Sequence, residues 1–294
     1  MREFSSFHPF VILSYFGVVI FFTMFQWNPV FLGISLVASI VFGIKALGID
    51  EFKKKILFSV FFFLIVVIAN PIFVHDGVTP LFYANGNAIT LEALIYGLAF
   101  AMMLISVIYW FNSFSKIMTS DKIIYIFSAI IPTIGLIISM VLRFIPQFQR
   151  QLKKIMDINK VAGDPYKSKS ISHRIATIFK TFSILLTWAF ENSIDTANSM
   201  KARGYGLKGR TTFHLFKFEK RDFIFIITMG CLVLLNVVLY KQAGLRFYYY
   251  PEIATVKLDA LSIISYISYV IMFTLPLIIE KKEELKWKSL VSKI

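Results

Sequence analysis

The sequence predicts an all-α polytopic membrane protein, with about six transmembrane helices and long amphipathic helices on the cytoplasmic side. The composition and the length of the apolar runs lead to this fold class. The mean hydropathy is +0.71, and only 16% of the residues are charged, against roughly 25% in soluble domains. Aromatic residues make up 17% of the chain, with 32 Phe. Several apolar runs approach the roughly 20 residues that a helix needs to cross a bilayer.

Six apolar segments are predicted to cross the membrane. Turn and breaker residues mark several of their ends, namely Asn28-Pro29, Asn70-Pro71 and the NGN stretch Asn85–Asn87. Pro276 is expected in the last turn of the final span, where a membrane helix tolerates it. The predicted spans are Pro9–Phe25, Pro29–Ile44, Ile56–Phe73, Leu91–Phe111, Asp222–Tyr240 and Leu258–Ile279.

The distribution of Lys and Arg predicts the side of the membrane on which each loop lies, because basic residues accumulate in cytoplasmic loops. Lys45–Lys55, Asn112–Lys122 and the basic tail 281–294 are therefore expected in the cytoplasm. Val74–Thr90 contains neither Lys nor Arg and is expected outside. The N-terminal segment lacks a small-residue cleavage site, so we expect a retained first helix rather than a cleaved signal peptide. Both chain ends would then be cytoplasmic.

The net charge of +14 at pH 7 is compatible with three interpretations. These are the basic bias of cytoplasmic loops, attraction to anionic lipid headgroups, and an acidic partner on the cytoplasmic side. Nucleic acid is not expected as a partner, because the basic residues flank apolar helices and no recognisable binding module is present. The single cysteine, Cys231, lies within an apolar run, so neither an intrachain disulfide nor a cysteine metal site is expected.

The segment 123–221 is the hardest to place. Ile123–Leu142 and Ile175–Phe190 are apolar enough to suggest further spans. Yet Arg143–Arg221 holds about three times as many Lys and Arg as Asp and Glu, which favours the cytoplasm. Either both apolar segments cross as a pair, or neither crosses fully. Because the pair would export the basic connection between them, we favour long helices that lie along the membrane interface.

Two amphipathic helices are predicted in this segment. The first follows Pro146 and is expected to stop at Ala162–Pro165, with Gly163 as its C-terminal cap. The second is expected to run to Lys201 and to end at Gly204 in a left-handed cap. The apolar positions at helical spacing are Phe148, Leu152, Ile155, Ile158 and Val161 in the first helix, and Phe190, Ile194 and Ala197 in the second.

The basic, glycine-rich stretch NSMKARGYGLKGRTTF, Asn198–Phe213, superficially matches two nucleotide-binding patterns. Gly204, Gly206 and Gly209 satisfy G-x-G-x-x-G, and the stretch nearly satisfies a phosphate-binding loop. A dinucleotide fingerprint follows a strand and opens a helix, whereas these glycines follow a predicted helix. The phosphate-loop pattern has Arg210 in place of its Lys. We therefore expect no nucleotide site and no bound cofactor.

Catalysis and ion coupling by the chain itself are not expected either. His8, His75, His173 and His214 are scattered, and neither H-E-x-x-H nor a serine nucleophile elbow is present. A proton-coupled transporter normally carries ionisable residues within its spans. The predicted spans hold almost none, and Glu92 lies at an outer end. The sequence thus predicts a non-catalytic protein without a metal site.

The tip around Arg203 has two interpretations. Lys201 and Arg203, in the last helical turn, would interact favourably with the helix dipole and its unpaired carbonyls. Alternatively, the guanidinium group, whose fork of donors suits a carboxylate, inserts into a groove on a soluble partner. The small neighbours Ala202 and Gly204 would then let the backbone of that partner approach.

The order of several motifs resembles the transmembrane T component of energy-coupling factor (ECF) transporters, similar to the cobalt-type CbiQ proteins. An HP pair, His8-Pro9, precedes the first span, and TSDK, Thr119–Lys122, opens the coupling region. LRFIPQFQRQLKKI, Leu142–Ile155, resembles the RFIP segment of the family. SMKARGYG, Ser199–Gly206, is similar to its second Ala-Arg-Gly motif. Most of the resemblance lies in this coupling region.

The first tip departs from the family pattern. The family usually has an Arg-centred triplet at both tips, whereas this sequence reads Val161-Ala162-Gly163. Either the first contact is apolar here, or a neighbour such as Lys160 supplies the charge, or this interface is weaker. The apolar segment Leu258–Ile279 also extends beyond the usual ending of the family.

The resemblance implies a non-catalytic subunit of an ATP-driven importer in a prokaryotic plasma membrane. Its partners would be two cytoplasmic ABC-type ATPases, which bind and hydrolyse ATP, and a substrate-binding membrane S component for a vitamin or metal ion. Pro132, Gly135 and Pro146 are candidate bends in the lever arm. The implied ATPase-binding residues are Val161, Ala162 and Gly163 at the first tip, and Ala202, Arg203 and Gly204 at the second.

The expected organisation follows from this resemblance. A four-helix membrane part (1–112) precedes the coupling-helix region (113–221), two C-terminal membrane helices (222–280) and the basic tail (281–294). A membrane anchor for an unrelated cytoplasmic partner is the main alternative function, since basic amphipathic helices also serve that purpose. A secondary transporter is a further alternative, but it would need carboxylates within the spans.

Overall fold

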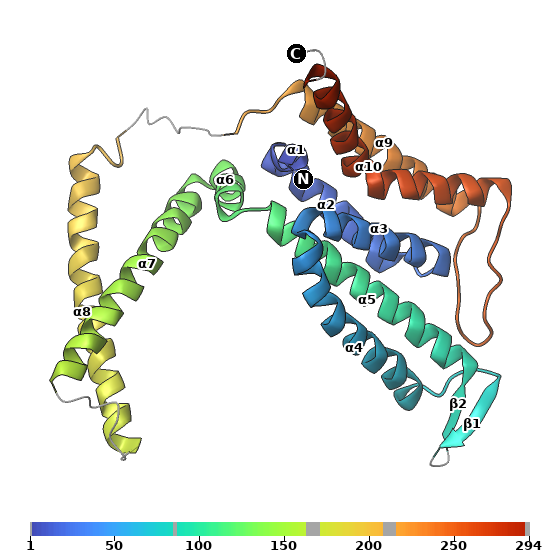
Figure 1. The fold of residues 1–294 in the computed structure, drawn as a ribbon, viewed down its shortest axis with the longest axis horizontal. Helices are drawn as coiled ribbons and strands as arrows, with labels where there is room; N and C mark the ends of the chain where they lie inside the picture. Colours follow the sequence, from blue (N-terminus) through green and yellow to red (C-terminus); the bar gives the residue numbers. More distant parts are fainter. Residues whose placement is uncertain (1, 85–86, 163–170, 208–215, 292–294) are drawn as a thin grey trace. The chain divides into compact units, whose positions relative to one another are not determined.

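A computed structural model describes residues 2–84, 87–162, 171–207 and 216–291 (Figure 1). The chain divides into two compact units. The first unit, formed by Met1–Ile123 and Phe216–Ile294, is a helical bundle with one β-hairpin. The second unit, Ile124–Leu215, is built from long helices.

The first unit contains the apolar helices of the chain. Its elements are α1 (Arg2–Ser5), α2 (Pro9–Phe25), α3 (Pro29–Leu47), α4 (Ile49–Phe73), β1 (Pro80–Ala84), β2 (Asn87–Thr90), α5 (Leu91–Ile117), α9 (Lys220–Gln242) and α10 (Ala260–Val291). The side chain of Asn28 caps α3 by accepting from the N–H of Val30 at 3.0 Å, and Thr90 caps α5 by accepting from the N–H of Ala93 at 3.3 Å.

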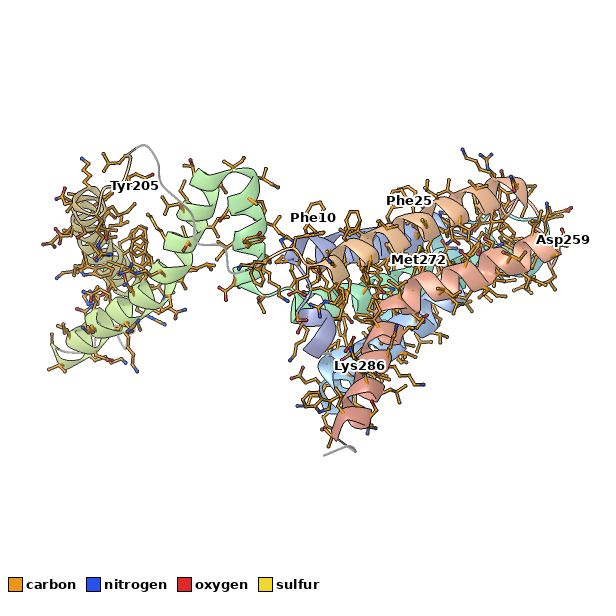
Figure 2. The ribbon with its side chains drawn as sticks, turned by 90° about the horizontal axis from the view of Figure 1, so that it is seen from above. Phe10, Phe25, Tyr205, Asp259, Met272 and Lys286 are labelled. Carbon is orange, nitrogen blue, oxygen red and sulfur yellow. The ribbon has the colours of Figure 1, made fainter. Side chains whose placement is uncertain are left out.

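The prediction of an all-α polytopic membrane fold is confirmed. Among the described residues, α3, α4, α5, α9 and α10 are long and apolar enough to cross a membrane, and α2 is a shorter apolar helix. Leu57 and Phe73 on α4 are 80% and 81% exposed. Figure 2 shows Phe10 and Phe25 on the outer surface of α2, while Met272 on α10 is buried. So large an apolar surface is unfavourable in water and is suited to lipid.

Several helices extend beyond the predicted spans, because charged residues at the ends of apolar segments continue the helix. α4 begins at Ile49 rather than Ile56, and α5 ends at Ile117 rather than Phe111. α10 runs to Val291, so most of the basic tail is helical. Pro276 lies inside α10, because the helix continues beyond the predicted end of the span at Ile279.

The segment Val74–Thr90, expected as a loop, contains an antiparallel hairpin. Its strands β1 and β2 pair Pro80 with Thr90 and Ala84 with Asn87. Glu92, in the first turn of α5, accepts a hydrogen bond from the hydroxyl of Thr79 at 2.6 Å. This bond attaches the start of the hairpin to α5.

Aromatic side chains fill the core of the first unit. Phe4 and Phe7, which precede α2, are buried, and the ring centroid of Phe7 lies 5.5 Å from that of Phe225 on α9. The hydroxyl of Tyr15 donates to the carbonyl of Phe273 at 2.7 Å, which joins α2 to α10. The fully buried large side chains include Phe4, Phe7, Tyr15, Phe16, Phe42, Trp110 and Phe273. The N-terminal residues are therefore part of the bundle core.

Hydroxyl and amide groups also join the apolar helices. Thr23 on α2 and Ser35 on α3 share a hydrogen bond of 2.7 Å, and Asn236 on α9 donates to Ser268 on α10 at 2.8 Å. Such bonds between small polar side chains hold membrane helices together where the hydrophobic effect cannot.

Lys122, in the TSDK motif at the start of the coupling region, belongs to the first unit. Its ammonium group is buried and donates to the carbonyl of Ser5 at 2.7 Å and to that of Ile117 at 2.9 Å. Burial lowers the pKa of Lys122. The two bonds tie the ends of α1 and α5 to the TSDK motif, and the charge complements the C-terminal end of the α5 dipole.

The second unit contains most of α6 (Ser120–Ile130), together with α7 (Pro132–Val161) and α8 (Ile171–Ala202). The segment Ile123–Leu142 is therefore not one continuous helix. Ile131 has an extended backbone, with φ −135° and ψ 98°. This conformation follows from Pro132, because the residue before a proline is disfavoured in the α-helical region.

Gly135 allows α6 and α7 to meet closely after this break. A Cβ atom at Gly135 would overlap the side chain of Ser128 and would lie 2.6 Å from its Cα atom. Ser128 is itself fixed, since its hydroxyl donates to the carbonyl of Ile124 at 2.7 Å. The corner between α6 and α7 thus depends on a position without a side chain.

Gly135→Ala is expected to destabilise this corner by about 1–3 kcal/mol, because a Cβ atom would press against the backbone of α6. The measurement is limited proteolysis and thermal unfolding of the detergent-solubilised chain. Gly230→Ala is the matched control, since a Cβ atom at Gly230 would have no neighbour within 4 Å. Equal stability of the two variants would contradict the close packing at Gly135.

Candidate functional site

The candidate coupling helices α7 and α8 pack against each other in antiparallel orientation. The ring of Phe148 on α7 meets that of Trp188 on α8 edge-on, with centroids 5.6 Å apart. Closer to the end of α7, the amide of Asn159 donates to the hydroxyl of Thr181 at 3.2 Å. A later position on α7 thus faces an earlier position on α8, as expected for an antiparallel pair.

The interface uses a mixture of apolar and polar residues. Ile155 on α7 and Thr177 and Thr181 on α8 are buried. The predicted apolar positions Phe190 and Ile194 lie on the opposite, open side of α8, 69% and 62% exposed. The face of α8 that the apolar periodicity predicted is therefore exposed. The face that packs on α7 contains Thr177 and Thr181 and was not predicted.

The second tip forms the predicted glycine cap. Gly204 has a φ of +83°, in the left-handed region. Its N–H donates to the carbonyl of Lys201 at 2.9 Å, and the N–H of Tyr205 donates to that of Met200 at 3.0 Å. These two bonds constitute a Schellman motif, which satisfies carbonyls at the end of α8. Ala202 and Arg203 are exposed immediately before this cap.

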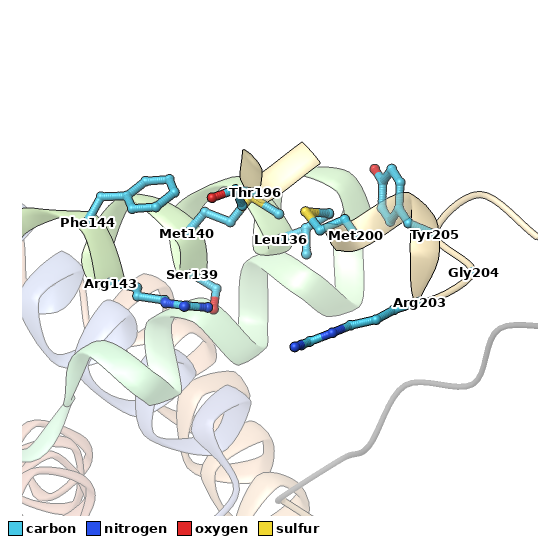
Figure 3. Close-up of a pocket in the computed structure, with 10 residues that line it drawn as sticks. All are labelled: Leu136, Ser139, Met140, Arg143, Phe144, Thr196, Met200, Arg203, Gly204 and Tyr205. Carbon is cyan, nitrogen blue, oxygen red and sulfur yellow. The ribbon is translucent and has the colours of Figure 1, made fainter. Parts of the chain in front are cut away.

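Arg203 also borders a pocket between the C-terminal end of α8 and the N-terminal half of α7 (Figure 3). Arg143 borders the same pocket from α7. Sequence reasoning missed Arg143 as a candidate site residue, because it is separated from Arg203 by most of both helices. Only the antiparallel packing brings the two arginines to one pocket.

The first tip is largely apolar. Val161 is the last residue of α7, 91% exposed, and Ile158 is 67% exposed. Ala162 follows as the C-terminal cap, and its N–H bonds to the carbonyl of Ile158. The ammonium of Lys160 lies 3.4 Å from a carboxylate oxygen of Asp157, so its charge is partly offset. Gly163, predicted as the cap, lies outside the described residues.

The two tips lie at opposite ends of the helix pair. Leu136 and Met140 of α7 line the pocket at the Arg203 tip, whereas Val161 ends α7. At 1.5 Å per residue, the stretch of α7 from Met140 to Val161 is about 30 Å long. The tips therefore present separate surfaces.

The three candidate bends have different structural positions. Pro132 is the first residue of α7, where its missing N–H leaves no helical bond unmade. Gly135 lies at the contact with α6 described above. Pro146 lies inside α7, and the helix continues on both sides of it. The interruption of regular helix thus occurs at Ile131, before Pro132.

The glycines that match nucleotide-binding patterns do not follow a strand, as those motifs require. Gly204 and Gly206 have positive φ values of 83° and 94° and follow helix α8 rather than a strand. Gly209 and Arg210 lie outside the described residues. Within the described ranges, no group of three His, Cys, Asp or Glu side chains is arranged to hold a metal ion.

Gly204→Val is expected to disrupt the cap of α8, because a β-branched residue at a φ of +83° costs about 1–2 kcal/mol. Gly204→Asn is the matched control, since Asn tolerates the left-handed region better than most residues. Hydrogen exchange of the amides at 204 and 205 is the measurement. The Val variant should lose protection there and the Asn variant should keep it. Unchanged protection in both variants would contradict the assigned cap.

Comparison with known proteins gives a consistent set of relatives. No protein-family model matches the chain. The chain is 28% identical over 207 residues to the energy-coupling factor transporter transmembrane protein EcfT of Staphylococcus aureus, covering 66% of this chain and 76% of the relative. It is 22% identical over 245 residues to the EcfT of Lacticaseibacillus paracasei, covering 79% of this chain and 91% of the relative.

A more similar but shorter match is the EcfT of Listeria innocua. The identity is 36% over 100 residues, which is 34% of this chain and only 38% of the length of that relative. Taken with the polytopic helical fold, these matches confirm that the chain resembles the transmembrane proteins of energy-coupling factor transporters.

Proposed function

We propose that the chain is the energy-coupling transmembrane scaffold of an ECF-type ABC importer. In this role it links two cytoplasmic ABC-type ATPases to a membrane S component that binds a vitamin or metal ion. The chain is the non-catalytic subunit, and ATP is bound and hydrolysed by its partners. The observation that carries the proposal is the antiparallel helix pair with two exposed tips about 30 Å apart.

The separation of the tips suits a scaffold that binds two partners. Each tip is the end of a long helix. Val161, the last residue of α7, and Arg203, which directly follows α8, are both exposed. A partner at one tip would not cover the other. Two ATPase subunits would therefore bind the same helix pair simultaneously.

Transmission of motion requires that the helices behave as stiff bodies. α7 and α8 are 30 and 32 residues long and are held together by the Phe148–Trp188 contact and the Asn159–Thr181 hydrogen bond. When the ATPases close on ATP, the tips would move with them. The change would reach the membrane as a reorientation of the helix pair, because packed helices move as rigid elements.

The two tips would contact their ATPases by different chemistry. Arg203 offers a planar fork of donors that suits a carboxylate. The first tip offers the exposed apolar side chains of Ile158 and Val161 and has Ala162 in the expected arginine position. Of the three alternatives for this tip, exposure of Ile158 and Val161 supports an apolar contact.

The proposed orientation places the helix pair at the cytoplasmic face of the membrane and both chain ends in the cytoplasm of a prokaryotic cell. Support comes from the loops rich in Lys and Arg, because such loops normally stay on the cytoplasmic side of the membrane. Neither α7 nor α8 is among the described helices that are long and apolar enough to cross. The pair would lie at the interface, with the exposed apolar side of α8 toward lipid or another membrane subunit.

Arg203→Glu is expected to reduce retention of the ATPases by at least tenfold, because it places a negative charge where a carboxylate is to be bound. The measurement is co-purification of the tagged chain with its candidate ATPases. Ala162→Glu is expected to weaken the apolar contact at the first tip and to lose part of the bound ATPase. Arg150→Glu is the matched charge reversal, on an exposed part of α7 that lies outside both tips and outside the pocket lining.

The outcomes separate the proposal from the main alternative. Loss of ATPase with Arg203→Glu and retention with Arg150→Glu would support docking by the tip. If the wild-type chain retains no ATPase, or if all charge reversals act equally, the coupling role is wrong. A membrane anchor for a different cytoplasmic partner would then be the better explanation.

A further inference from the structure

The pocket between α7 and α8 has a composition that the proposed coupling role does not explain. Its volume is about 380 Å³, enough for a small polar group with part of an attached chain. Both helices of the second unit contribute to it. The lining residues are Leu136, Ser139, Met140, Arg143 and Phe144 of α7, Thr196 and Met200 of α8, and Arg203, Gly204 and Tyr205 at the tip.

The charged and apolar side chains of the pocket are separated from each other. In Figure 3, Arg143 and Arg203 extend toward each other from opposite ends of the pocket, with Ser139 beside Arg143. The apolar side chains of Leu136, Met140 and Met200 lie along the other side. The pocket thus has a cationic edge and an apolar floor.

The cationic edge carries uncompensated charge. None of the ten lining residues is acidic. Neither Arg143 nor Arg203 forms an ion pair with any residue in the described part of the chain. Both arginines are exposed, and two positive charges on one edge of a pocket without an acidic lining residue attract an anion. Arginine forks also bind phosphate oxygens bidentately.

We propose that this pocket binds the phosphate headgroup of an anionic phospholipid. The two guanidinium groups hold the phosphate, and the proximal part of an acyl chain lies on the apolar floor. Exposed apolar residues of α7 continue this floor beyond the pocket, with Ile137 53% and Val141 50% exposed. A free phosphate ion would use the arginines alone and leave the apolar floor uncovered.

A lipid at this site would fix the helix pair at the membrane surface. The headgroup lies at the boundary between the lipid chains and the cytoplasm, where basic residues of peripheral helices bind anionic lipid. The inference goes beyond the proposed coupling role and does not depend on it, because binding of a lipid at Arg143 and Arg203 requires no ATPase. The lipid would also engage Arg203, so its binding and the docking of an ATPase carboxylate would compete for one side chain.

The test is native mass spectrometry of the full-length chain in neutral detergent, without ATPases, with phosphatidylglycerol or phosphatidylcholine added at equal concentration. The wild-type chain should retain one phosphatidylglycerol in at least about fivefold preference to phosphatidylcholine. Arg143→Gln and Arg203→Gln should each remove most of that preference. Lys154→Gln, which removes the same charge from α7 outside the pocket, should preserve it.

Three results would overturn the inference. The first is unchanged preference in both arginine variants, and the second is an equal loss with Lys154→Gln, which would indicate diffuse attraction to the basic surface. The third is release of the lipid by millimolar inorganic phosphate, which would show that the apolar floor contributes nothing. Because no ATPase is present, failure here leaves the coupling role standing, and failure of ATPase co-purification leaves this inference standing.

Discussion

The antiparallel packing of α7 on α8 is the interaction on which the site depends. It brings the C-terminal end of α8 beside the N-terminal half of α7, and so creates the two-arginine pocket. It also leaves Val161 and Arg203 at opposite ends of the helix pair. The contacts that maintain the packing are few, but they are spread along both helices, from Asn159–Thr181 through Phe148–Trp188 to the pocket. A parallel arrangement of the same helices would bring both tips to one end.

Two local constraints act on the chain before this pair. Lys122 ties the ends of α1 and α5 together by donating to the carbonyls of Ser5 and Ile117. A few residues later, the extended backbone at Ile131 ends α6, and the absence of a side chain at Gly135 lets α7 start in close contact with it. The membrane bundle is stabilised separately, by buried aromatic rings and by hydrogen bonds between small polar side chains.

Much of the fold could be predicted from the sequence because the membrane helices are long, continuous runs of apolar residues. Apolar runs identified the membrane helices, and Gly204 identified the cap of α8. The interface between α7 and α8 could not be predicted in this way, since Thr177 and Thr181 are polar residues whose burial depends on a partner helix. The hairpin at 80–90 was also missed, although the Asn85-Gly86 pair is typical of hairpin sequences. Arg143 belongs to the pocket only through tertiary packing, so no local pattern marks it.

The most direct test of the account is the distance between the two tips, measured by pulsed electron spin resonance. Spin labels would be attached at Ile158→Cys and Ala202→Cys in a Cys231→Ser background, which removes the single native cysteine. The antiparallel pair predicts one narrow distribution centred at about 30 Å. A mean distance below about 20 Å would place both tips at one end, and a broad distribution would show that the helices do not move as a rigid pair. Either result would contradict the role of α7 and α8 as stiff levers with separate docking tips.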